Sequence, residues 1–202
     1  HHYSFTENAF VEFLKRFGQE RYEFYYSETN THQILDDVKN RTCDLGIIYL
    51  SKENETVLRR VLEDYQLVFT ELFVAKPHVF LRKTHPLAQQ ASLSLKALEA
   101  YPRLNFVQNE YESVYYAEEL FSHIPTDKAI RINDRGAIVN FLLSLDAYTI
   151  ASGIFPKYLN GDNIIAIPLE EDEYMKIGYI LNVNQELSEL GKLYIEEIKK
   201  YA

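Results

Sequence analysis

Apolar and polar positions repeat along this chain with two different periods, which predicts a mixture of helices and strands. Phe10, Leu14 and Phe17 recur at helical spacing in the first such stretch. Residues 45–50 form a continuous apolar run instead, which is typical of a strand covered on both faces. Residues 21–26 alternate between aromatic and polar side chains, a pattern that predicts a strand.

The predicted helices and strands follow one another in a regular order. Helices are expected to begin at Ser4, Asn30, Glu55, Leu93, Asn109, Asp134 and Ser188. Further strands are expected at residues 67–74, 78–81, 103–107, 128–132, 148–151, 164–168 and 177–183. This alternation predicts an α/β fold with parallel-sheet character.

The alternation falls into two clusters, which predicts two lobes joined by crossing strands. Residues 1–78 are expected to form lobe I and residues 79–175 lobe II, with residues 176–202 returning to lobe I. At 202 residues the chain is long enough to bury a substantial core.

Charge and composition narrow the possible partners. The net charge of −9, with acidic residues gathered at 170–173, argues against a nucleic-acid surface in this chain, although a basic module could be attached elsewhere. No apolar run approaches the ~18–20 residues of a membrane span, so no membrane partner is expected. No signal peptide is visible, and Cys43 is the only cysteine, which fits a reducing cytoplasm.

Polar side chains gather at three predicted helix starts. In open α/β sheets the starts of helices and the carboxyl ends of strands face the ligand site, and helix N–H groups favour anions or carboxylates. Ser, Thr and Asn are also ordinary capping residues, so capping alone is the competing interpretation. If two lobes face each other, these starts would line one cleft; they are residues 3–6, residues 29–31, and Gln108 with Asn109.

No arrangement of side chains indicates catalysis. The sequence contains no HExxH, CxxC, P-loop, GxGxxG or GxSxG motif. His78 and His85 lie seven residues apart, which is no standard metal-ligand spacing. Cys43 follows a predicted helix and reads as a small buried side chain rather than a nucleophile. We therefore expect no enzyme, no metal and no cofactor.

Several of these stretches together resemble the effector-binding domain of LysR-type transcriptional regulators. Their order and spacing carry the resemblance, which covers nearly the whole chain; they are TNTHQIL (29–35), CDLGI (43–47), HPLA (85–88), LSLKAL (93–98), IVNFL (138–142) and AYTIASGI (147–154). Two departures stand out. Residues 146–148 lack the family's usual glycines, and the family's first strand and N-terminal winged helix-turn-helix would precede Tyr3. DNA binding would therefore belong to a missing N-terminal domain.

The resemblance implies a fold and a function. It implies two Rossmann-like lobes with a hinge, like type-2 periplasmic binding proteins, and a small anionic or amino-acid-like effector in the interlobe cleft. It also implies a homo-oligomer, a dimer or a tetramer. The expected effector-binding residues are Ser4, Phe5, Thr6, Thr29, Asn30, Thr31, Phe106 and Gln108.

Two more specific alternatives stay open. Residues 3–6 and Ile154-Phe155-Pro156 look similar to streptococcal regulators of methionine and cysteine supply. A solute-binding receptor of a transport system with the same architecture is the alternative function. The sequence does not name the effector.

Overall fold

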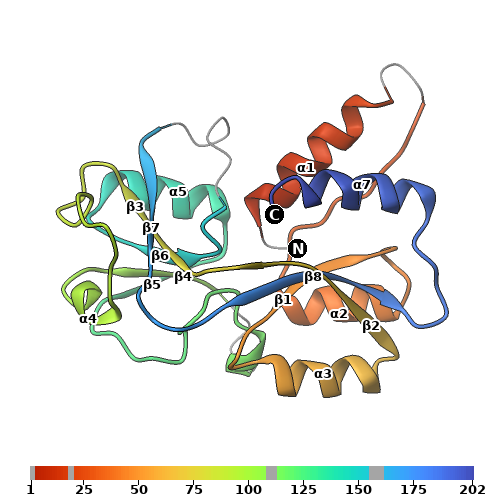
Figure 1. Ribbon diagram of the computed structural model, residues 1–202, viewed down its shortest axis with the longest axis horizontal. Helices are drawn as coiled ribbons and strands as arrows, with labels where there is room; N and C mark the ends of the chain where they lie inside the picture. The colour runs from red at the N-terminus through yellow and green to blue at the C-terminus, as the bar shows by residue number, and fades with distance from the viewer. Residues whose placement is uncertain (1–2, 18–20, 108–112, 155–161) are drawn as a thin grey trace. The chain divides into compact units, whose positions relative to one another are not determined.

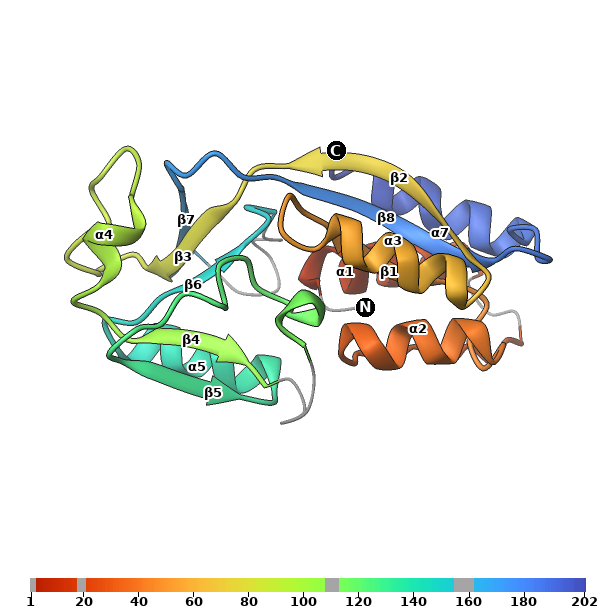
Figure 2. The ribbon, with the colours of Figure 1, turned by 90° about the horizontal axis from the view of Figure 1, so that it is seen from below.

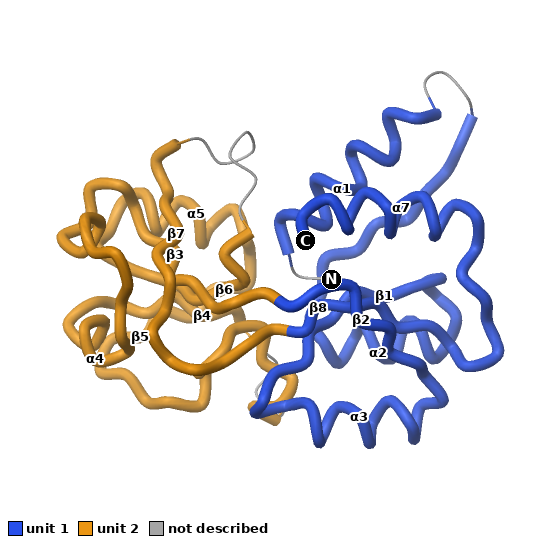
Figure 3. Tube along the Cα trace, in the orientation of Figure 1, with its two compact units in different colours: residues 1–74, 176–202 blue, residues 75–175 orange. Residues whose placement is uncertain are grey.

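Strands and helices alternate along the chain, which divides into two units (Figures 1 and 3). The computed structural model describes residues 3–17, 21–107, 113–154 and 162–202. Unit 1 comprises residues 1–74 and 176–202, and unit 2 comprises residues 75–175. No helix in the described ranges is both long and apolar enough to cross a bilayer.

Unit 1 is built on a three-stranded sheet with the order β1-β8-β2. The strands are β1 (Gly46–Leu50), β2 (Leu67–Ala75) and β8 (Met175–Asn182). All five residues of β1 are buried, as their continuous apolar run predicted. β1 runs antiparallel to β8, with Gly46 opposite Ile180.

Helices cover both faces of this sheet. Figures 1 and 2 show α2 (Thr31–Lys39) and α3 (Glu55–Asp64) on one face, and α1 (Ser4–Lys15) with α7 (Glu189–Lys199) on the other. Helix α2 packs closely on β1 at Gly46, where an added Cβ would lie 2.4 Å from the Cγ2 atom of Ile34. The glycine of the CDLGI stretch is therefore required by this close approach.

Aromatic rings form much of the packing between α1, residues 22–26 and α7. Phe13 is 2% exposed, and its ring lies 5.1–6.1 Å from the rings of Phe17, Phe24, Phe10 and Tyr194. Rings at such separations in tilted and edge-to-face geometries add to the free energy gained by burial. This cluster ties the first and last helices of unit 1 together.

The strand predicted at residues 21–26 does not form, and this prediction was wrong. The segment has no regular secondary structure and belongs to no described ladder. Strands are stable only when their backbone groups pair with a neighbour. β1 is an edge strand among the described strands, but a pocket separates its start from residues 23–27.

Unit 2 contains two small sheets. In the first, β3 (His78–Arg82) lies between β6 (Thr149–Ala151) and β7 (Ile164–Pro168), antiparallel to both. In the second, β4 (Arg103–Phe106) pairs in parallel with β5 (Ala129–Ile132). The expected parallel character is thus limited to β4 and β5 among these ladders. β6 and β7 both run opposite to β3, so the first sheet is entirely antiparallel.

The core of unit 2 is mainly aliphatic. Helix α5 (Arg135–Ser144) packs Ile138 and Leu142 against it, and the short helix α4 (Leu95–Leu98) buries Leu98. The remaining buried members of the main cluster are Phe80, Leu104, Ile132, Ala147 and Ile164.

The helix predicted from Asn109 to about Phe121 is absent from its described part, so this prediction was also wrong. Residues 108–112 lie outside the described ranges, and after them only a single 3₁₀ turn, η1 (Val114–Tyr116), forms. The following residues, 117–120, are buried without regular structure. The segment exchanges hydrogen bonds with β4, and those bonds replace a helix.

Candidate functional site

The start of α2 combines a helix cap with polar side chains. The Asn30 side chain accepts a hydrogen bond of 2.9 Å from the Gln33 backbone N–H, which confirms the predicted cap. Thr31, the first helical residue, is only 5% exposed, and Thr29 lines the neighbouring pocket. The three residues therefore lie together at one helix N-terminus, where backbone N–H groups favour negative charge.

The start of α1 is organised differently from its prediction. Ser4 is not the N-cap; Tyr3 takes that place and makes no side-chain cap bond. The Thr6 hydroxyl, which is fully buried, donates to the Tyr3 carbonyl oxygen at 2.6 Å, and the Tyr194 hydroxyl donates to the Thr6 carbonyl oxygen at 3.1 Å. Phe5 is also fully buried in unit 1. Phe5 and Thr6 therefore stabilise the start of α1, whereas Ser4 is partly exposed.

The remaining predicted site residues belong to unit 2. Phe106 ends β4 and is half-buried, and its backbone N–H donates to the Glu119 carboxyl at 2.9 Å. Gln108 lies outside the described residues, as do Phe155 and Pro156 of the segment that resembled the streptococcal regulators. The structure thus places residues 4–6 and 29–31 in unit 1 and Phe106 in unit 2.

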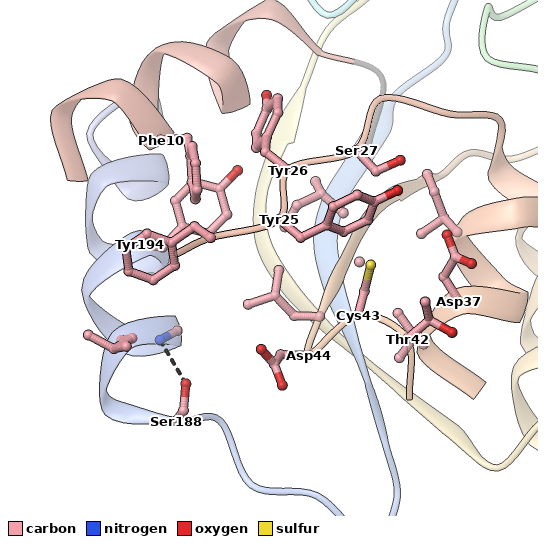
Figure 4. A pocket seen from close by; sticks show the side chains of 18 of the residues that line it. Phe10, Tyr25, Tyr26, Ser27, Asp37, Thr42, Cys43, Asp44, Ser188 and Tyr194 are labelled. Atoms are coloured by element: carbon pink, nitrogen blue, oxygen red, sulfur yellow. Dashed lines mark hydrogen bonds between the residues drawn. The ribbon is translucent and has the colours of Figure 1, made fainter. Parts of the chain in front are cut away.

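A pocket of about 240 Å³ lies within unit 1, beside the start of β1 (Figure 4). In Figure 4 the rings of Phe10 and Tyr194 lie on one side of it, with Asp37 and Thr42 on the opposite side. Of the predicted site residues that the structure describes, only Thr29 lines it. Its aromatic wall could not be predicted from the sequence, because Phe10 has the spacing of an ordinary core residue. Other lining residues include Tyr25, Tyr26, Ser27, Cys43, Asp44, Gly46, Ser188 and Gly191.

The charge of this pocket makes it unsuitable for an anion. Glu23, Asp37 and Asp44 line it, and no Lys, Arg or His of the described ranges does. Burial, followed by the neighbouring Asp37 carboxylate, raises the pKa of the Cys43 thiol, which keeps the thiol protonated and poorly nucleophilic. The anion-favouring helix start and this acidic pocket are therefore different kinds of site.

Two buried charged residues of unit 2 were not singled out from the sequence. Arg103 is 2% exposed and donates to the carbonyl oxygens of Leu120 and Ile124, at 3.0 and 3.3 Å. Glu119 is 7% exposed, and burial raises the pKa of its carboxyl to about 8. The pair Glu118-Glu119 sits in a stretch that reads as a helix, where charged residues normally face solvent, so no signal marked it.

Comparison with known protein families assigns this chain to one of them. The family model for the LysR substrate binding domain matches residues 3–202, nearly the whole chain. The chain belongs to the LysR substrate-binding domain family. Its mixed α/β fold is the type-2 periplasmic-binding-protein-like fold of that family. No curated protein sequence matches the chain.

Solved structures of LysR-type proteins share its fold. The effector-binding domain of QuiR in complex with shikimate has 20% sequence identity and a TM-score of 0.61, covering 96% of this chain and 88% of QuiR. The reduced OxyR regulatory domain from Pseudomonas aeruginosa has 14% identity and a TM-score of 0.66, covering 97% and 91%. HinK, a LysR family regulator from Pseudomonas aeruginosa, has 13% identity and a TM-score of 0.62, covering 98% of this chain.

The chain spans 64% of the length of HinK, whereas it covers about nine tenths of the isolated QuiR and OxyR domains. At these identities the likeness to solved structures establishes the fold alone. The family match over residues 3–202 therefore assigns the chain to this family, and the solved structures agree with it in fold.

Proposed function

We propose that this chain is the effector-sensing domain of a cytoplasmic LysR-type transcription regulator, and that another part of the protein contacts DNA. The observation that carries the proposal is the family match over residues 3–202. The net charge of −9 supports it, because a surface that binds DNA needs a basic excess. Membership in a family of regulators favours this function over a transport receptor.

Within this function, the effector is a small anion or amino-acid-like molecule held at helix starts. Ser4 and residues 29–31 provide hydroxyl and amide groups beside the N-termini of α1 and α2. The helix dipole adds about 0.3–1 kcal/mol of attraction for a negative group there. Phe106 and Gln108 are proposed as contacts from the other unit, and Phe5 and Thr6 as supports of the α1 start.

Signalling requires that the effector favour one arrangement of the protein over another. A ligand with equal affinity for both arrangements shifts nothing. A coupling free energy of about 1–3 kcal/mol is enough for typical regulation. We propose that the two units are lobes whose arrangement the effector biases, and that a dimer or tetramer of the full-length protein transmits the change.

Ligand-dependent thermal stability tests this proposal. The 202-residue chain would be melted alone and with carboxylates, amino acids and sulfur metabolites, the last because residues 3–6 and 154–156 resemble regulators of methionine and cysteine supply. Each hit would be compared with its methyl ester, which has a similar shape but lacks the negative charge. A ligand at about 100 times its Kd should add about 2.7 kcal/mol of stability. Equal stabilisation by acid and ester would contradict an anion site at the helix starts.

A further inference from the structure

The strongest unexplained feature of unit 2 is a buried segment without regular structure. Residues 117–120 are all buried, yet they form neither helix nor strand. A buried segment of this kind needs hydrogen-bond partners for its polar groups, since each unpaired group costs free energy. Two of these bonds join the segment to β4.

Two ionisable side chains, those of Arg103 and Glu119, connect the segment to opposite ends of β4. At the start of the strand, the Arg103 guanidinium donates to the Leu120 and Ile124 carbonyl oxygens, 3.0 and 3.3 Å away. At the end of the strand, the Glu119 carboxyl accepts from the Phe106 N–H at 2.9 Å. In the first case the side chain comes from β4, and in the second it comes from the segment, so each stretch helps to hold the other in place.

Backbone strain beside the segment indicates that these bonds are needed. Phe121 has φ = 61°, in the left-handed region that a residue with a bulky side chain rarely adopts. Such a conformation persists only where the surrounding structure over-determines it. The bonds on either side of Phe121, at Leu120 and Ile124, come from Arg103.

Burial, modified by the neighbouring charges and hydrogen bonds, determines the protonation of Glu119. Burial is the largest cause of its raised pKa of about 8, and the neighbouring Glu118 carboxylate raises it further. The Phe106 N–H bond and the Arg103 guanidinium act in the opposite direction but do not outweigh burial. Tyr148, which faces Arg103, has its own pKa raised by burial. At neutral pH the Glu119 carboxyl is therefore mostly uncharged, and it can accept the Phe106 hydrogen bond in that state.

We propose that the uncharged Glu119 carboxyl is a positioning group that fastens residues 117–120 to the carboxyl end of β4, and that its ionisation releases this end of the strand. An ionised Glu119 carboxylate gains more from water than from the backbone N–H bonds and the Arg103 charge that this buried site offers. Release of the segment exposes the charge to solvent and frees Phe106. The placement of Phe106 against an effector rests on the proposed function; the fastening itself does not.

Hydrogen exchange of the Phe106 amide tests the inference without any effector. The measurement uses the 202-residue chain and compares wild type with Glu119→Gln from about pH 7 to 9, with protection factors corrected for intrinsic exchange. Linkage from a folded pKa of about 8 predicts that wild-type protection falls about tenfold across this range. The amide side chain introduced by Glu119→Gln keeps an acceptor oxygen but cannot ionise, so protection should stay constant in the variant.

The Leu95 amide provides a matched internal control. It also donates to a glutamate carboxyl, that of Glu171, at 2.7 Å in the same unit. Loss of protection at Phe106 while Leu95 stays protected supports a local release. Equal loss at both amides, a flat wild-type profile, or the same fall in Glu119→Gln would each overturn the proposal. If Glu119→Gln fails to fold, the comparison of Phe106 with Leu95 in wild type still decides.

Discussion

The two units use different side chains to pack their helices and strands. Unit 1 is packed by aromatic rings around Phe13, whereas unit 2 has an aliphatic core around Leu104 and Leu142. Both units also bury carboxyl groups. In unit 1 the Glu197 carboxylate is held in ion pairs with Arg16 and Lys200, whereas in unit 2 the Glu119 carboxyl accepts from a backbone N–H.

We infer that stability and ligand sensing depend on different residues in this chain. In unit 1 the buried rings supply much of the packing, and we propose that the polar start of α2 contacts the effector. In unit 2 the buried side chains of Arg103 and Glu119 bond the segment 117–120 to β4, and we propose that the protonation of Glu119 affects how firmly that segment is held. We therefore expect large pH effects in unit 2 and ligand effects at the helix starts of unit 1.

The largest effect is expected from truncation of the aromatic cluster. Phe13→Ala should lower the unfolding free energy of unit 1 by about 3–5 kcal/mol, because it removes a buried ring that contacts four others and leaves a cavity. Leu104→Ala in unit 2, where the side chain is fully buried, is the matched truncation and should cost about 2–5 kcal/mol. Urea unfolding followed by circular dichroism, with hydrogen exchange to assign the loss to a unit, measures both. A loss below about 1 kcal/mol for Phe13→Ala would show that the rings do not hold unit 1.

An intermediate effect is expected from pH. The Glu119 pKa is raised from 4.5 to about 8, so the folded state keeps a proton that the unfolded state loses, and stability falls as pH rises between these values. Burial lowers the pKa of His85 below 6.5, which has the opposite sign and acts only up to about that pH. Between about pH 6.5 and 8 the stability of unit 2 therefore changes through Glu119 and not through His85. Its free energy of unfolding should fall by about 1–2 kcal/mol over this range.

Glu197 provides the contrast in unit 1. Its hydrogen bond with Lys200 is the largest cause of a lowered pKa, so its contribution is lost only as pH falls below about 4.5. Urea midpoints of wild type and Glu119→Gln from about pH 6.5 to 8 measure the difference. The fall should vanish in the variant, and a fall of the same size in both would assign it to another group.

The smallest effects are expected from the helix caps. Ser188 caps α7 in unit 1 by accepting from the Gly191 N–H at 3.0 Å, and Asp134 caps α5 in unit 2 by accepting from the Ala137 N–H at 2.7 Å. Ser188→Ala and Asp134→Ala should each cost about 1 kcal/mol, since each leaves one helix N–H unpaired. Thermal unfolding measures both. A cost above about 3 kcal/mol would mean that the side chain does more than cap its helix.

The features of this fold that depend on residues close together in the sequence could be predicted from it. The caps at Asn30, Asp134 and Ser188 follow from short polar side chains that accept bonds from nearby N–H groups, and the structure confirms all three. The apolar run at 45–50 contains β1 (Gly46–Leu50), whose residues are all buried, as a continuous apolar stretch covered on both faces predicts. Each of these features depends on neighbours within a few residues.

The failures involve partners distant in the sequence. Residues 21–26 have the pattern of a strand but belong to no described ladder, and residues 113–121 have helix-forming side chains but exchange bonds with β4 instead. The buried state of Glu119 depends on the same tertiary contact, so nothing in its local sequence marked it. The helix starts could be predicted as caps, but whether they also bind an effector depends on groups from elsewhere in the fold.

Calorimetric titration of the acid that gives the largest stabilisation in the thermal screen, against two helix-start variants, tests the central claim most directly. Thr31→Ala removes a hydroxyl at the proposed site, and Ser188→Ala removes one at a cap that lines the acidic pocket instead. We predict that Thr31→Ala keeps its fold and loses about tenfold in affinity, or ~1.4 kcal/mol, whereas Ser188→Ala binds as wild type does. Unchanged affinity in a folded Thr31→Ala variant, or a loss confined to Ser188→Ala, would contradict effector binding at the start of α2.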